Sequence, residues 1–511
     1  MAFNVKAIAK IYGPAFLSGL LLVLSFPDFN LYPLAWVSLV PLLLSLWDKD
    51  RLTAFKAGCV TGIVFFAGTL YWIYHSIAYY GNVHLILSFF IVLLLAFYLS
   101  LYTGLFAMAF STNIVRSRLP AVIIAPVFWV TLEFIRSYAL TGFPWASLGY
   151  SQFRFLGLIQ VADITGIYGI SFIIVAINGA ITDLFILRKR EERMPLLSRV
   201  WFYSGLTGLS LVLVFTFAYG QFRLNQDRPG KVVRAAIIQG NIEQDMKWQP
   251  EYQRAVFETY KSLTLQAISY SPSIIIWPET ALPFYFGYEK ALTDELIAFQ
   301  KGLGTYLLTG GVVVRRPPSE GVTAELTNSA ILLDRGGNVP YIYDKIHLVP
   351  FGEYVPLKKV LFFLDKLVAG IGEYTPGDKL IKAYTDAGRF GTFICYEIIF
   401  PGLVRKFYSQ EGDFIVNITN DAWFGKTAGP YQHFGMAVFR AIENRKPLLR
   451  AANTGVSGYI DSNGRIIRAT PIFERCFEIV DMKTDTTRTV YSRYGDIFSY
   501  LCIVATLLLI L

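Results

Sequence analysis

The chain has 511 residues, of which 54% are hydrophobic and only 16% are charged, against roughly 25% charged residues in an average soluble domain. Together with the mean hydropathy of +0.46, this excludes an ordinary soluble enzyme and predicts membrane spans joined to a water-soluble part. The net charge of +9 would allow a nucleic-acid partner, but the basic residues follow the predicted membrane topology, so we expect no nucleic acid.

Long apolar stretches fill the N-terminal part of the chain and its C-terminal end. A helix needs roughly 20 apolar residues to cross the hydrocarbon core of a bilayer. With a window of that length the sequence predicts eight spans, at residues 12–27, 31–47, 57–80, 84–112, 119–139, 163–187, 200–220 and 495–511. The first two of these are short and contain Pro14, Pro33 and Pro41.

The loops between these spans differ in lysine and arginine content, which is higher on the cytoplasmic side of membrane proteins. One alternating set holds twelve such residues: Lys6, Lys10, Lys49, Arg51, Lys56, Arg116, Arg118, Arg188, Lys189, Arg190, Arg193 and Arg199. The other short loops hold only Arg154. We therefore expect both termini to be cytoplasmic and residues 221–494 to lie outside.

Two charged residues lie inside the fifth predicted span, near its outer end. Glu133 and Arg136 are three residues apart, which is the spacing of a local ion pair on one helix face. An ionisable residue within a span is a functional candidate by default, but we favour a local pair at the membrane interface. We interpret His75, near the outer end of the third predicted span, as a further interface residue.

Residues 221–494 are numerous enough to form one sizeable core. Helical stretches such as 250–269 and 290–302 lie between short β-branched runs, and this mixture predicts a layered α/β domain. The predicted strands lie within 232–241, 273–280, 305–314, 328–334, 391–397 and 413–421. Because these runs are continuously apolar, we expect sheets that are buried on both faces.

Three of these predicted strands lead into residues that can carry chemistry. The stretch SIIIWPET ends at Glu279, YIYDKIHLVPFGEYVP contains Lys345 and Glu353, and GTFICYE ends with Cys395 and Glu397. A single cysteine in such a run is more often a small core residue. An acid, an amine and a thiol at three strand ends together indicate a catalytic site.

The four cysteines are scattered along the chain. No spacing among Cys59, Cys395, Cys476 and Cys502 is typical of a metal site, so we expect no metal. Cys59 and Cys502 lie in predicted spans, which leaves Cys395 and Cys476 in the soluble part. A disulfide between these two is an open alternative, and it would compete with any thiol chemistry.

The segments WPET (277–280), DKIHLVPFGEYVP (344–356) and CYEIIFP (395–401) resemble the signature segments of the nitrilase superfamily, which uses a Glu–Lys–Cys triad. With its eight spans, the whole chain resembles the apolipoprotein N-acyltransferase family, to which residues 141–152, 239–248, 419–425 and 450–458 are also similar. This resemblance implies a membrane α-helical bundle plus an α/β nitrilase-like domain, an αββα sandwich. The implied domains are 1–220 (seven spans), 221–494 (catalytic) and 495–511 (eighth span).

The resemblance also implies an activity: moving an acyl chain from a phospholipid to the free α-amine of the diacylglyceryl-cysteine of an apolipoprotein. The implied donor is phosphatidylethanolamine, with no cofactor, in a monomer of the bacterial inner membrane whose catalytic domain is periplasmic. Carried over by position, Cys395 is the nucleophile of a ping-pong reaction through a thioester, Glu279 is the base and Lys345 the oxyanion partner. A backbone N–H, that of Tyr396, is the second oxyanion donor that we expect.

Further roles follow from the same resemblance. Glu353 is expected to orient Lys345, and Glu397 to hold local geometry. Trp248, Tyr396 and Trp423 match positions that line or gate the site, although core packing would explain them equally well. Two apolar segments, 282–290 and 360–370, are expected to dock on the outer leaflet and frame an acyl-chain entrance, unless they pack on the transmembrane bundle.

Two other functions fit parts of the sequence. A membrane-anchored amidase of the nitrilase type would hydrolyse a C–N bond with water as the second nucleophile, but eight spans exceed what an anchor needs. A transporter with an extracytoplasmic binding domain would show paired repeats or several charges among its spans. The spans show no repeat pairing and hold few charges, so we favour the acyltransferase.

Overall fold

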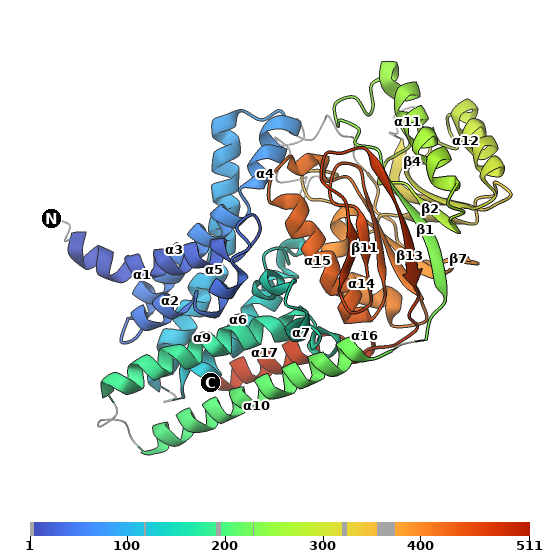
Figure 1. Ribbon diagram of the computed structural model, residues 1–511. Coiled ribbons are helices and arrows are strands. Elements are labelled where there is room, and N and C mark those ends of the chain that lie inside the picture. Colours follow the sequence, from blue (N-terminus) through green and yellow to red (C-terminus); the bar gives the residue numbers. More distant parts are fainter. Residues whose placement is uncertain (1–4, 117–118, 191–195, 228, 319–323, 355–373) are drawn as a thin grey trace. The chain divides into compact units, whose positions relative to one another are not determined.

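The computed structural model describes residues 5–116, 119–190, 196–227, 229–318, 324–354 and 374–511. The chain divides into two compact units (Figure 1). The first comprises Met1–Tyr74, His84–Gln226 and Tyr494–Leu511, and the second comprises His75–Val83 and Asp227–Arg493.

The first unit is helical. Its longer helices are α1 (Val5–Leu24), α3 (Arg51–Thr69), α5 (Leu85–Arg116), α6 (Ala121–Arg136), α9 (Ile167–Arg190), α10 (Leu196–Asn225) and α17 (Ile497–Ile510). Within it, α3 packs against α1 and α5, and α6 packs against α9 and α17. Within the described residues, four helical segments are long and apolar enough to cross a membrane: Arg51–Thr69, Leu85–Ile114, Ile167–Ile186 and Arg199–Asn225.

Short helical turns connect the long helices. They are η1 (Tyr32–Trp36), α2 (Val40–Ser45), α4 (Trp72–His75), η3 (Ala139–Thr141), η4 (Leu148–Gln152), α7 (Leu156–Ile159) and α8 (Ala162–Thr165). The second predicted span, 31–47, is therefore not one helix but η1 followed by α2. Proline is tolerated in the first turn of a helix but disrupts its interior, and Pro33 and Pro41 each lie in the first turn of a short helix.

The third predicted span, 57–80, is also interrupted. Helix α3 ends at Thr69, and the turn η2 (Ser76–Tyr80) belongs to the second unit. The hydroxyl of Ser76 there donates a hydrogen bond of 2.7 Å to the backbone oxygen of Trp423. Apolar residues 70–80 thus serve packing as well as span length, and the number of eight spans stays a prediction.

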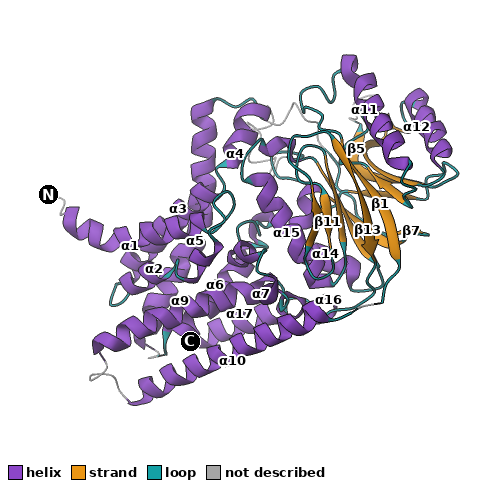
Figure 2. Cartoon of the chain, viewed as in Figure 1, coloured by secondary structure: helices purple, strands orange, loops and turns teal. Residues whose placement is uncertain are grey.

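The second unit contains two β-sheets (Figure 2). One sheet has the order β13-β1-β2-β4-β5-β6 with β3 beside β4, and the other has the order β12-β11-β10-β9-β8-β7. The strands of the first are β1 (Val232–Gln239), β2 (Ile274–Ile276), β3 (Tyr285–Phe286), β4 (Tyr306–Arg316), β5 (Glu325–Leu333), β6 (Tyr341–Asp344) and β13 (Cys476–Lys483). Those of the second are β7 (Ala383–Thr385), β8 (Gly388–Ile394), β9 (Phe414–Thr419), β10 (Leu448–Ala452), β11 (Gly458–Ile460) and β12 (Ile466–Ala469).

The sheets form the inner layers of this unit and helices lie outside them. Strand β1 lies against β10 and β5 against β8, so the two sheets face each other. The α-helices among the described residues of the unit are α11 (Pro250–Ile268), α12 (Lys290–Leu303), α14 (Pro401–Tyr408), α15 (Gly429–Asn444) and α16 (Val490–Tyr494). Side chains of α11 and α12 share an apolar core with β1, β2 and β4. The predicted layered α/β domain and its six predicted strands are confirmed.

Chain direction brings the residues of interest to one region. Strands β8, β9 and β10 run parallel, as do β1, β2 and β4. Glu279 comes shortly after β2, Cys395 directly after β8, and Asn420 directly after β9. Because parallel strands end at the same edge of a sheet, their carboxyl ends gather functional residues, as is usual in α/β folds.

Candidate active site

Cys395 lies at a strained turn between strand β8 and the short helix η7 (Cys395–Ile399). Its φ is 50°, a left-handed conformation that costs a non-glycine residue on the order of 1–3 kcal/mol. The side chain is buried. Burial and the neighbouring charge of Glu279 raise the pKa of the Cys395 thiol, although Lys345 opposes them. At neutral pH this residue is a thiol that needs a base, not a preformed thiolate.

Glu279, beside that thiol, accepts hydrogen bonds at both of its carboxyl oxygens. One oxygen, Oε1, accepts hydrogen bonds from Nδ2 of Asn328 at 2.8 Å and from Nζ of Lys345 at 3.3 Å. The other, Oε2, accepts from the backbone N–H of Asn420 at 2.9 Å. Three donors stabilise the anion that a general base requires.

Lys345 is buried between two carboxylates. Its Nζ lies 2.9 Å from Glu353 and 3.3 Å from Glu279. Burial alone would lower the pKa of Lys345, but the charges of Glu353 and Glu279 raise it above its ordinary value, so the side chain stays a cation. Glu353 in turn accepts from the backbone N–H of Val349 at 2.8 Å and from Asn328 at 2.9 Å. The expected neighbourhood of Glu353 and Lys345 is therefore present in the structure.

Glu397 lies under the turn that carries Cys395. Its carboxylate accepts from the hydroxyl of Tyr343 at 2.8 Å and from the N–H groups of Ile346 at 2.7 Å and His347 at 3.1 Å. The second oxygen accepts from the N–H of Ile394 at 2.8 Å. Burial raises the pKa of Glu397 to about 7. This side chain ties the segment after β6 to the end of β8.

The three predicted aromatic residues lie in different settings. Trp248 is 39% exposed, with its ring 6.0 Å from that of Tyr285. Tyr396 is buried and packs edge-on against Phe400 at 5.0 Å. The ring of Trp423 lies 5.1 Å from that of Tyr80. Tyr80 lies in the segment His75–Val83, which belongs to the second unit. The ring of Trp248 is thus partly open to solvent, whereas the ring of Tyr396 is packed inside the unit.

Three contacts of this site were not anticipated from the sequence. Asn328 bridges Glu279 and Glu353, the N–H of Asn420 binds Glu279, and Lys247 lies beside both Glu279 and Cys395. Nζ of Lys247 donates to the backbone oxygen of Glu279 at 3.0 Å and to the hydroxyl of Thr280 at 2.6 Å. Burial lowers the pKa of Lys247 to about 8. Lys247 and Asn420 lie inside segments that resemble the family, 239–248 and 419–425, whereas Asn328 begins the predicted strand 328–334 and had no such signal.

Two predicted features of the second unit need comment. All four cysteines are free thiols, so a disulfide between Cys395 and Cys476 does not form. Within segment 282–290, Leu282, Phe284 and Phe286 are buried in the core of the unit, whereas Tyr285 and Tyr288 are exposed, so docking of the exposed part on a membrane stays a prediction. Segment 360–370 lies outside the described residues.

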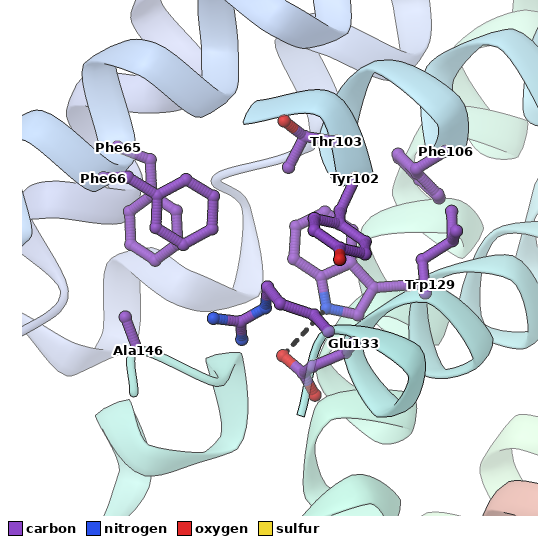
Figure 3. Close-up of a pocket in the computed structure, with 10 residues that line it drawn as sticks. Phe65, Phe66, Tyr102, Thr103, Phe106, Trp129, Glu133 and Ala146 are labelled. Atoms are coloured by element: carbon purple, nitrogen blue, oxygen red, sulfur yellow. Dashed lines mark hydrogen bonds between the residues drawn. The ribbon is translucent and has the colours of Figure 1, made fainter. Parts of the chain in front are cut away.

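The two charged residues of the fifth predicted span lie on α6 and are buried inside the first unit. Glu133 and Arg136 both border a small cavity of about 20 Å³ (Figure 3), room for about one water. Glu133 accepts from the N–H of Leu148 at 2.7 Å, and from Trp129 at 3.3 Å. Arg136 donates to the backbone oxygen of Trp145 at 2.6 Å. Because each side chain binds nearby backbone, both hold segment 143–148 against α6.

Comparison with known proteins places the whole chain in one family. A family model described as the apolipoprotein N-acyltransferase N-terminal domain matches residues 18–180, and one described as carbon-nitrogen hydrolase matches residues 234–491. An amidase structure from Nesterenkonia sp. shares 17% sequence identity and a TM-score of 0.39 over 54% of this chain and 98% of that chain.

Curated relatives match over nearly their full length. The apolipoprotein N-acyltransferase of Geobacter metallireducens is 42% identical, covering 96% of this chain and 93% of its own. That of Pasteurella multocida is 32% identical, covering 96% of this chain and 92% of its own. These matches confirm the resemblance seen in the three motifs, and the chain belongs to the apolipoprotein N-acyltransferase family of acyltransferases.

Proposed function

We propose that the chain transfers an acyl chain from a phospholipid to the free α-amine of the N-terminal diacylglyceryl-cysteine of an apolipoprotein. One observation carries this proposal: the thiol of Cys395 lies within electrostatic reach of both Glu279 and Lys345 in a single buried site. That arrangement supplies a nucleophile, a base and a fixed cation, which are the groups that acyl transfer needs.

In the first half-reaction, Sγ of Cys395 attacks the ester carbonyl carbon of the phospholipid while Glu279 takes the thiol proton. The oxyanion that forms is stabilised by the cation of Lys345 and by the backbone N–H of Tyr396. The ester C–O bond then breaks, and Glu279 returns the proton to the departing lyso-phospholipid alkoxide. The acyl chain remains on Cys395 as a thioester.

In the second half-reaction, the α-amine of the apolipoprotein attacks the thioester carbonyl and loses a proton to Glu279. The C–S bond breaks, the N-acyl product forms, and the proton returns to the sulfur of Cys395. Because one substrate leaves before the other reacts, the kinetics are ping-pong. In this scheme Glu353 orients Lys345, and Glu397 fixes the turn that carries the nucleophile. Trp248, Tyr396 and Trp423 line or gate the acyl path.

We further propose the cellular arrangement that this reaction requires. The four apolar helical segments and the family support a membrane protein. In our proposal eight spans cross a bacterial inner membrane, with domains at 1–220, 221–494 and 495–511. Both termini are cytoplasmic, the catalytic domain is periplasmic, the donor is phosphatidylethanolamine and the protein is a monomer.

Intact mass spectrometry tests the proposal. After incubation with phosphatidylethanolamine, the wild type should gain the mass of one acyl chain, and hydroxylamine should remove it. Cys395→Ser should gain no hydroxylamine-labile adduct, whereas Cys476→Ser, a matched loss of the other cysteine in this unit, should behave as wild type. A diacylated lipopeptide with a free amine should then discharge the adduct as N-acyl peptide. Discharge only to water, as free fatty acid, would support an amidase-type hydrolase instead.

A further inference from the structure

A second polar cluster contacts Cys395 and has no place in the triad motifs. It consists of Thr419, Asp421, His433 and Arg450, which we term the support cluster. Thr419 ends β9, Asp421 begins η8 (Asp421–Phe424), His433 lies on α15 and Arg450 on β10. All four side chains are buried. Four polar groups from four elements are expensive to bury, so their arrangement invites an explanation.

The support cluster lies against Cys395 at two points, its side chain and its backbone carbonyl. The hydroxyl of Thr419 lies near enough to the Cys395 thiol to lower its pKa, against the larger effect of burial, and it donates to Oδ1 of Asp421 at 2.9 Å. Nε2 of His433 lies 3.2 Å from the backbone oxygen of Cys395. The same cluster therefore touches both the side chain and the carbonyl group of the nucleophile.

The contacts of His433 place a proton on Nε2. Nη2 of Arg450, which can only donate, lies 2.9 Å from Nδ1 of His433 and 2.8 Å from Oδ2 of Asp421. Nδ1 also lies 2.9 Å from Oδ1 of Asp421, which as a carboxylate oxygen accepts. The proton on Nε2 follows instead from the carbonyl oxygen of Cys395, which can only accept and lies 3.2 Å from Nε2. Burial and the charge of Arg450 lower the pKa of His433, although Asp421 opposes them.

The partners of His433 are themselves fixed. Arg450 also donates to the side chain of Asn417, whose amide binds the backbone oxygen of Phe393 at 2.8 Å. Although burial opposes it, the charge of Arg450 lowers the pKa of Asp421 to about 2. Asp421 therefore stays a carboxylate at neutral pH and keeps its contacts with Arg450 and His433.

The contact to the Cys395 carbonyl bears on catalysis through the next residue. The carbonyl of Cys395 and the N–H of Tyr396 belong to one peptide group, which is planar and trans, so the two point in opposite directions. We propose that His433 is a positioning residue whose Nε2–H holds the Cys395 carbonyl, so that the Tyr396 N–H faces the oxyanion of the acyl-transfer intermediate. This inference rests on the proposed function, because it assigns that N–H to the oxyanion.

A restraint is needed at this peptide because Cys395 is in the left-handed region, with a φ of 50°. Rotation of the Cys395–Tyr396 peptide would present a carbonyl to the oxyanion instead of an N–H, and so replace attraction by repulsion. Glu397 restrains the chain before Cys395 through the N–H of Ile394. His433 restrains the peptide after it, at the only carbonyl whose orientation decides where the Tyr396 N–H points.

Two amide variants separate this role from a merely structural one. His433→Gln places an N–H donor at the position of Nε2, whereas His433→Asn ends one bond earlier and cannot reach the Cys395 carbonyl. Two reactions are then compared in the full-length protein in detergent. Acylation of Cys395 by p-nitrophenyl acetate passes through an oxyanion, whereas alkylation by iodoacetamide is a displacement that forms none.

We expect His433→Asn to slow single-turnover acylation by about 10- to 100-fold, below the ~10²–10³-fold cost of removing an oxyanion donor outright. Its alkylation rate should stay within about threefold of wild type, and His433→Gln should recover most of the acylation rate. Equal acylation by both variants, or equal slowing of acylation and alkylation, would overturn the proposal. If His433→Asn does not fold, His433→Phe supplies a donor-free ring of similar size for the same comparison.

Measuring acylation with phosphatidylethanolamine as well as with the aryl ester tests the proposed function and the role of His433 separately. A wild type acylated by the aryl ester but never by the phospholipid would refute the phospholipid reaction alone. The comparison of His433→Gln with His433→Asn on the aryl ester would still decide the role of His433. Conversely, normal phospholipid acylation in His433→Asn would refute the positioning role and leave the proposed function intact.

Discussion

Lys345 and Lys247 are both buried near the thiol of Cys395, but their pKa values are shifted in opposite directions. Lys345 contacts the carboxylates of Glu279 and Glu353, which raise its pKa. Lys247 contacts a backbone oxygen and the hydroxyl of Thr280, and burial lowers its pKa to about 8. Burial favours the neutral form of both side chains, so the different partners account for the difference.

Lys345 and Lys247 therefore have different roles. Lys345 is a permanent positive charge, and a fixed charge aimed at a developing oxyanion is effective because it needs no reorganisation. Lys247 holds the backbone that follows Glu279 and changes its charge within the working range of pH. We therefore expect loss of Lys345 to abolish chemistry and loss of Lys247 to tune it.

The largest expected effect comes from Lys345→Met. Acylation of Cys395 should fall by about 10³-fold, since an oxyanion partner is lost and two carboxylates are left without their cation. Intact mass spectrometry of the acyl adduct after single turnover measures the loss. In Lys345→Met/Glu353→Gln one excess carboxylate is removed, so thermal stability should recover while acylation does not. Recovery of acylation in the double variant would contradict a direct role for Lys345.

Adjacent glycines test how closely Glu279 must be held between the two lysines. A Cβ on Gly310 would lie 2.6 Å from Cα of Glu279 and 2.5 Å from the N of Thr280, so backbone must move. A Cβ on Gly311 would instead meet side chains, the ends of Leu282 and Ile331 at 3.0 and 3.2 Å and Cβ of Leu282 at an ordinary 3.5 Å.

Gly310→Ala should therefore slow acylation by about 10²-fold, because small misplacement of a catalytic group is costly. Gly311→Ala, one residue further along the same strand, should cost little activity. Single-turnover rates and thermal melting of both variants check this. Similar losses of activity in the two variants would mean that strand packing, not the position of Glu279, limits the rate.

Glu353→Gln sharpens the contrast by removing one of the two charges that hold Lys345 protonated. The amide can still accept a hydrogen bond from Nζ, so the side chain stays in place but the charge-assisted part of the contact is lost. We expect a decrease in acylation of about tenfold, consistent with the loss of a charged hydrogen bond. Glu325→Gln, which removes a carboxylate from the partly exposed pair with Arg316, should leave acylation unchanged.

The contacts of Lys345 could be anticipated, because Glu279 and Glu353 lie in segments that are recognisable in the sequence. Glu279, Lys345 and Cys395 each follow a short apolar strand, and strand ends are visible in the sequence. Asn328 and His433 were not identified, because what makes them important is a partner far away in the chain. Asn328 binds Glu279 from 49 positions away, and His433 reaches Cys395 from 38. No local pattern marks such pairs.

The helical part shows a different limit of sequence reasoning. Long apolar runs such as those of α5 and α10 are predicted well, because length and hydropathy decide them. The run 57–80 was predicted as one span, yet its last part packs with the second unit through Ser76 and Tyr80. Hydropathy measures how apolar a segment is, and an apolar segment can be buried by protein as well as by lipid.

The smallest expected effect concerns the charge of Lys247. Glu279 and Cys395 raise the pKa of this lysine relative to burial alone, so by reciprocity its positive charge stabilises the thiolate that forms at Cys395. As pH rises through about 8, Lys247 loses this charge and the stabilisation is lost with it. The rate of aryl ester acylation should then fall by about threefold to tenfold, the size of a charged interaction of about 1 kcal/mol.

Lys247→Met should remove this pH-dependent step and give, at every pH, about the low rate that the wild type reaches at high pH. Lys261→Met changes a lysine that pairs with Glu295 away from the site, and it should keep the wild-type profile. Stopped-flow acylation between pH 6 and pH 10, on the order of two units either side of that pKa, checks this. A step that persists in Lys247→Met would belong to another group, and Lys247 would then act through its hydrogen bonds alone.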